Sequence, residues 1–130
     1  MRDLFAPSGL LPLLLSSSPA AATLLYASSY SGSITTLNFT LFANHATQST
    51  LLPISSSDGC APSPSWLTLD PVNSRLYCTD EGLTTNVGTV SSFTTKPDGV
   101  LQQLAKTETI SGPVSAVVFG DRGQGLAVAQ

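Results

Sequence analysis

The chain has 130 residues, of which 42% are apolar and only 10% are charged, and its formal net charge is −3. This balance excludes disorder driven by excess charge. The five Lys and Arg residues form no basic run, which excludes a nucleic-acid surface.

The N-terminus has the pattern of a cleaved signal peptide. An apolar run over residues 10–15 is followed by small residues that lead to Ala20-Ala21-Ala22, a typical cleavage sequence. The run is shorter than the roughly 20 residues of a membrane span, and two prolines would interrupt a helix there. We therefore expect a signal peptide over residues 1–22, a mature protein that begins near Thr23, and secretion.

Short strand patterns separated by turn residues fill the rest of the chain, and helical periodicity is absent. In the first unit we expect strands over 23–28 and 33–40, an edge strand over 50–54, and a Ser-, Gly- and Pro-rich connection over 55–64.

Turn residues divide the next part into a four-stranded antiparallel meander. A third unit follows Ser111-Gly112-Pro113 and turns at residues 120–123. The strands expected in the meander are 65–70, 75–79, 88–94 and 100–104, and the last strand of the chain is expected at 126–129.

Two pairs of segments repeat at a spacing of roughly 50 residues. Residues 25–28 (LYAS) correspond to 76–79 (LYCT), and 64–69 (PSWLTL) correspond to 113–118 (PVSAVV). Repeats of this length built from short strands are typical of propeller blades. We therefore expect an all-β fold, a β-propeller fragment of about two and a half four-stranded antiparallel blades over residues 23–130.

A propeller closes with about four to eight blades, so further C-terminal blades are expected to complete it. Cys60 and Cys78 are the only cysteines, and in an oxidising compartment they either pair or remain two small buried side chains. The sequon at Asn38 is a candidate glycosylation site, with Asn38 on a solvent face and its two neighbours pointing inward.

Several motifs occur in order and at blade spacing along residues 23–130. They are 64–70 (PSWLTLD), 76–81 (LYCTDE), 88–93 (GTVSSF), 99–101 (GVL), 112–114 (GPV) and 126–129 (LAVA). With these motifs the chain resembles the fungal branch of the seven-bladed propeller lactonase family. That family includes 6-phosphogluconolactonase-like proteins and the carboxymuconate lactonizing enzyme, a cyclase.

The resemblance implies a candidate catalytic residue, Glu81, which matches a family glutamate near the central channel. Glu81 would activate water or hold a substrate hydroxyl; the alternative is a strand-end carboxylate bonded to loop amides. Ser115 stands where bacterial members often carry a histidine, which argues against phosphogluconolactonase-type chemistry. His45 is expected in an exposed turn, and Trp66 and Phe93 in the blade core.

The implied activity is hydrolysis of a sugar lactone by the whole propeller, and the present chain alone is expected to be inactive. The alternatives are carboxymuconate cyclisation and a non-catalytic binding scaffold, because the propeller fold hosts many functions. The expected partner is a small-molecule lactone or organic acid. The sequence indicates no cofactor, metal site, nucleic-acid partner or membrane span.

Overall fold

The computed structural model describes residues 21–41 and 49–130. This part of the chain forms three antiparallel sheets of three, four and two strands and has no helix, so none that could cross a membrane. The expected all-β architecture is therefore confirmed. Nearly all of the predicted signal peptide, and His45, lie outside the described residues.

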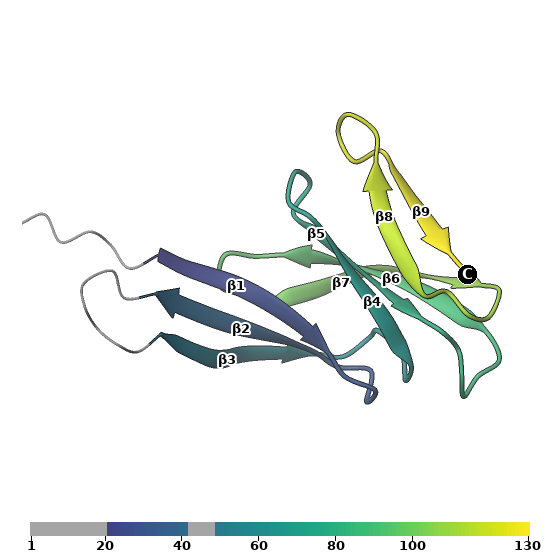
Figure 1. The fold of residues 1–130 in the computed structure, drawn as a ribbon, viewed down its shortest axis with the longest axis horizontal. Helices are drawn as coiled ribbons and strands as arrows, with labels where there is room; N and C mark the ends of the chain where they lie inside the picture. The colour runs from purple at the N-terminus through teal and green to yellow at the C-terminus, as the bar shows by residue number, and fades with distance from the viewer. Residues whose placement is uncertain (1–20, 42–48) are drawn as a thin grey trace, which may run out of the picture.

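Each sheet is a simple meander, in which every strand pairs with the next one along the chain. Strands β1, β4 and β8 contact one another in that order, so the sheets lie side by side, as blades do around an axis (Figure 1). The strands are β1 (Ala21–Ser28), β2 (Ile34–Leu41), β3 (Thr50–Ser57), β4 (Pro64–Asp70), β5 (Arg75–Asp80), β6 (Gly88–Thr95), β7 (Leu101–Thr109), β8 (Ser115–Phe119) and β9 (Gly125–Ala129).

Strands β3 and β7 are longer than the sequence predicts. The expected ends were residues 54 and 104, whereas β3 continues to Ser57 and β7 to Thr109. Both lie at the outer edge of their sheets, where most side chains are exposed and apolar alternation is not required. The Ser55 hydroxyl also ties the end of β3 to the second sheet by donating to the Gly99 carbonyl, at 2.8 Å.

The hydrophobic core of the described residues lies between the first and second sheets. Tyr26 and Leu67 pack against it from the inner strands of the two sheets, and burial raises the pKa of Tyr26. Phe93 is fully buried there, as expected. The cluster consists of Ile34, Cys60, Leu76, Cys78, Phe93 and Leu101.

The connection from β3 to β4 is fastened to this core. Cys60 and Cys78 form a disulfide with a Cα–Cα distance of 5.7 Å, and both residues are fully buried. The Cys60 amide donates to the Gly32 carbonyl in the β1–β2 turn at 3.2 Å. The Ser91 hydroxyl donates to the Gly59 carbonyl at 2.7 Å. One short segment thus contacts both sheets.

Hydroxyl groups also link each sheet to the next through backbone carbonyls. Thr36 donates to Gly99 at 2.7 Å across the first interface. Ser65 donates to Pro113, and Thr68 to Ala116, each at 2.7 Å across the second. Each of these acceptors is a backbone carbonyl of the following sheet or of a segment leading into it.

The β4–β5 turn holds the β8–β9 turn through one amide. The Asn73 side chain donates to Asp70 Oδ2 at 2.7 Å and to the Arg122 carbonyl at 2.8 Å. The bond from Asn73 lowers the pKa of the Asp70 carboxyl below its ordinary value, because it favours the charged form.

Asn38 does not lie as the sequence predicts. Regular pairing of β2 with β1 places it on the same face as the buried residues Ile34 and Thr36, with Leu37 and Phe39 on the other face. Asn38 is half-buried in the central strand of the sheet, and the Thr40 hydroxyl lies 3.5 Å from its side-chain oxygen. Its glycosylation stays a prediction.

Trp66 is not a core residue in this structure, contrary to expectation. Its side chain is 48% exposed and borders a shallow groove whose other lining residues belong to β8 and β9. The face of β8 that bears Val117 is also open, since Val117 is 60% exposed. An aromatic residue in a strand therefore does not by itself identify the core.

We predict that the disulfide contributes substantially to stability. A Cys60→Ala/Cys78→Ala double variant should lose about 3 kcal/mol of unfolding free energy, because the bridge restricts the unfolded chain. Urea unfolding with and without a thiol reductant measures this. Wild-type protein should lose stability on reduction while the double variant is unaffected by the reductant, and equal wild-type curves would contradict the prediction.

We also predict that Gly99→Ala is more damaging than Gly112→Ala. Both glycines have left-handed φ values, 81° and 90°. An added Cβ at Gly99 would lie 2.9 Å from Cγ2 of the fully buried Thr36, whereas at Gly112 it meets nothing within 4 Å. Gly112→Ala should cost about 1 kcal/mol from backbone strain, and Gly99→Ala at least about 1 kcal/mol more from overpacking. Similar unfolding midpoints for the two variants would disprove the packing argument.

Candidate functional site

Glu81, the residue singled out by the sequence, directly follows β5. Its amide donates to the Ser63 carbonyl and its carbonyl accepts from the Gly112 amide, both at 2.9 Å. Ser63 precedes the inner strand β4, and Gly112 lies shortly before the inner strand β8. Glu81 is thus fixed between the segments that lead into two successive inner strands, with its side chain half-buried.

Ser115, the other position singled out by the resemblance, begins β8 and is half-buried. It borders the Trp66 groove and does not line the pocket described next. Glu81 and Ser115 therefore do not share either of these two cavities.

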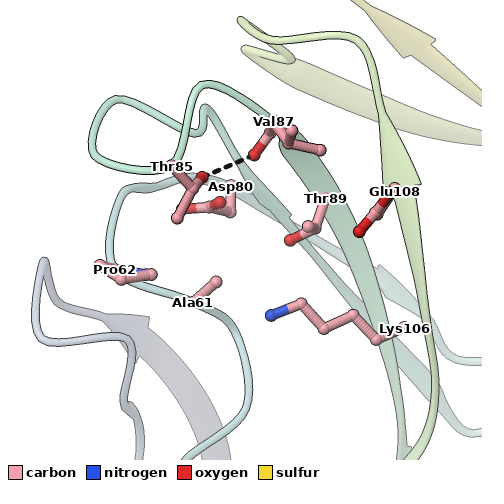
Figure 2. A pocket seen from close by; sticks show the side chains of 8 residues that line it. All are labelled: Ala61, Pro62, Asp80, Thr85, Val87, Thr89, Lys106 and Glu108. Atoms are coloured by element: carbon pink, nitrogen blue, oxygen red, sulfur yellow. Dashed lines mark hydrogen bonds between the residues drawn. The ribbon is translucent and has the colours of Figure 1, made fainter.

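A pocket of about 420 Å³ lies at the end of the second sheet where β5 stops and β6 starts (Figure 2). Two segments enclose it: the β3–β4 connection contributes Ala61 and Pro62, and the β5–β6 loop contributes Thr85 and Val87. The second sheet contributes the buried residues Asp80 and Thr89 at the floor and the exposed residues Lys106 and Glu108 at the rim, from strands β5, β6 and β7.

Strand register explains why these four residues lie close together. Asp80 pairs with Thr89, and Thr89 pairs with Glu108, so the three form one row across the sheet. Ser91 pairs with both Cys78 and Lys106 in the adjacent row on the same face. The β3–β4 connection lies over this second row, held by the disulfide to Cys78 and by the hydrogen bond from Ser91. Lys106, at the end of the row, extends past this connection and lines the pocket.

Asp80 is the most unusual group in the pocket. Its side chain is 1% exposed, and Oδ1 accepts from the Ser63 amide at 2.6 Å. Its other oxygen, Oδ2, has no hydrogen-bond partner among the described residues. The Thr89 hydroxyl, in a residue 8% exposed, is likewise without a partner there. Two neighbouring buried polar atoms are therefore left unsatisfied at the pocket floor.

The rim of the pocket carries both signs of charge. Lys106 and Glu108 are exposed residues of β7, and Figure 2 shows the Lys106 ammonium group pointing across the pocket towards Ala61. The Thr85 hydroxyl is occupied, because it donates to the Val87 carbonyl at 2.8 Å. The pocket thus has a carboxylate oxygen and a hydroxyl on its floor that lack partners among the described residues, and an ammonium donor above them.

Sequence reasoning did not find this pocket. Asp80 and Thr89 lie within two of the family-like motifs, but neither they nor Lys106 and Glu108 were singled out. A signal was available in the alternation of β5 and β6, which places Asp80 and Thr89 on one face. Lys106 and Glu108 could not be added, because β7 was expected to end before them.

Among residues 21–41 and 49–130, no three His, Cys, Asp or Glu side chains are grouped so that they could hold a metal ion.

Comparison with known proteins identifies the family. Residues 23–130 match the family model described as lactonase, 7-bladed beta-propeller. No curated protein and no solved structure matches the chain significantly. The matched region begins beside the expected start of the mature protein and includes all three sheets from β1 to β9. The chain therefore belongs to the seven-bladed β-propeller lactonase family.

Proposed function

We propose that the protein is a secreted lactonase-like hydrolase that opens a sugar lactone, and that further blades complete its propeller. The observation that carries the proposal is the position of Glu81 within a chain of the lactonase family. Its backbone is held from both sides by segments leading into inner strands, at Ser63 and Gly112. In a propeller these segments surround one mouth of the central channel.

Lactone opening needs a base and a group that stabilises the carbonyl oxygen. In the proposed step the Glu81 carboxylate takes a proton from water, the water oxygen attacks the carbonyl carbon, and negative charge develops on the carbonyl oxygen. The ring C–O bond then breaks, the ring oxygen takes up the proton, and the product is a hydroxy acid. Donors for the developing charge are proposed to come from blades that follow β9.

Secretion rests on three features of the chain. They are the leader-like sequence over residues 1–22, the sequon at Asn38 and the Cys60–Cys78 disulfide. Disulfides persist in oxidising compartments, which is where glycosylation at Asn38 also occurs. We accordingly propose that residues 1–22 are removed.

The first experiment is the intact mass of the native protein in culture medium and in cell extract. About seven blades of roughly 50 residues predict a mass near 40 kDa. A secreted species close to the mass of residues 23–130 would contradict the requirement for further blades.

The second experiment tests the role of Glu81 in the native protein. A Glu81→Gln variant should lose about a hundredfold or more in kcat for hydrolysis of D-glucono-1,5-lactone, because a general base contributes that much. Asp121→Asn, at an exposed turn, serves as the control and should retain activity. Full activity of Glu81→Gln would reject its proposed role.

The same assays separate the alternative functions. Formation of a lactone from carboxymuconate, without hydrolysis of sugar lactones, would identify a cyclase. Saturable binding of lactones with no turnover in either direction would identify a binding scaffold. We expect residues 23–130 alone to show no turnover.

A further inference from the structure

The pocket around Asp80 is separate from the position of Glu81 and needs an explanation of its own. Glu81 does not line it, and its walls come from the second sheet, the β5–β6 loop and the segment that joins the first sheet to the second. It is therefore complete within the described residues. Its volume of about 420 Å³ lies in the range of small-molecule sites.

The two unsatisfied groups indicate that something polar belongs in this space. A buried acceptor or donor without a partner costs about 1–3 kcal/mol, and more when it is charged. Asp80 Oδ2 and Thr89 Oγ1 lie in paired positions of adjacent strands, so one ligand can reach both. Water can bond to both groups in the free protein, and a ligand that carries hydroxyl groups can replace this water.

The charges of the lining select the kind of ligand. Asp80 and Glu108 each carry a formal charge of −1 and Lys106 carries +1, so the lining has an excess of one negative charge. An anion is disfavoured there, because it would face two carboxylates. An apolar ligand would leave Asp80 Oδ2 unpaired.

Neighbouring hydroxyl groups on a neutral ring match the lining best. A sugar hydroxyl can donate to a carboxylate and accept from an ammonium group at the same time. Two adjacent hydroxyls can donate to Asp80 Oδ2 and Glu108, while Thr89 bonds to either of them and Lys106 donates to an oxygen of the ring. The short apolar wall at Ala61 and Pro62 suits the C–H face of such a ring.

We propose that the pocket formed by Asp80, Thr89, Lys106 and Glu108 binds a neutral polyhydroxylated ring, such as a monosaccharide or an uncharged sugar lactone. This binding site is distinct from Glu81 and does not depend on the proposed hydrolase activity. Asp80 is the central acceptor, fixed in place by the Ser63 amide.

Isothermal titration calorimetry of the full oxidised chain tests the proposal. The probes are D-glucono-1,5-lactam, which resists hydrolysis, neutral monosaccharides, the anion D-gluconate, and calcium alone. Saturable binding of the lactam or of a neutral sugar is expected, with gluconate at least about tenfold weaker because of charge repulsion.

Three substitutions assign the binding to this pocket. Asp80→Asn keeps an acceptor for the Ser63 amide but removes the charge, and Lys106→Met removes the ammonium group. Each should weaken binding by about tenfold or more. Thr89→Val keeps the shape and should also weaken binding, while leaving the unfolding midpoint unchanged or raised, because it removes an unsatisfied hydroxyl.

Thr107→Val is the matched control, since Thr107 lies between Lys106 and Glu108 on the opposite, exposed face of β7. It should leave binding unchanged. The readout is binding by a chain that is expected to show no turnover, so a lack of lactone hydrolysis in the native protein leaves it unaffected, which separates failure of this proposal from failure of the proposed hydrolase function.

Three results would overturn the proposal. The first is the absence of saturable binding by every neutral probe. The second is binding that Asp80→Asn and Thr89→Val leave unchanged. The third is binding of calcium alone that Asp80→Asn abolishes. If Lys106→Met lowers the unfolding midpoint and no probe binds, Lys106 serves as an internal counter-ion to Asp80, and the proposal is wrong.

Discussion

The attachment of the β3–β4 connection to the second sheet is the constraint on which the rest of the structure depends. This segment of six residues joins two meanders that otherwise meet through a small core. The disulfide at Cys60 fixes it to the middle of β5, and Gly32 and Ser91 bond to it from either side. Ala61 and Pro62, which follow directly, gain a defined position because of that anchor. The packing of the first two sheets and the wall of the Asp80 pocket thus have one physical origin.

Much of the fold could be predicted from the sequence, because turn residues and strand alternation act locally. The inner strands were found within a residue or two of their observed positions. The strand ends that were predicted wrongly lie where burial imposes no alternation of apolar and polar residues. Strands β3 and β7 are exposed edges, so nothing in their apolar spacing marks where they end. Trp66 was misjudged because its environment depends on how neighbouring sheets meet.

The candidate site was less predictable than the fold, for a related reason. Glu81 was identified through resemblance to a family, since a lone carboxylate after a strand has no distinguishing pattern. The pocket beside it depends on register across three strands and on a loop that crosses them, and neither is encoded in any short motif. Only the three-dimensional structure shows that Asp80 and Thr89 share a cavity and lack hydrogen-bond partners among the described residues. Long-range pairing, rather than residue type, therefore defines this site.

The hydroxyl bonds between sheets bear on how such repeats diverge. Ser65 and Thr68 each reach a carbonyl 48 residues further along the chain, which is close to the repeat length. Since every residue type presents the same carbonyl, the accepting position can change its side chain freely, and only the donor must remain a small hydroxyl residue. Neighbouring blades can thus lose nearly all sequence identity while their mutual geometry is preserved. This explains why the internal repeat survives here mainly as a spacing, in a chain rich in serine and threonine.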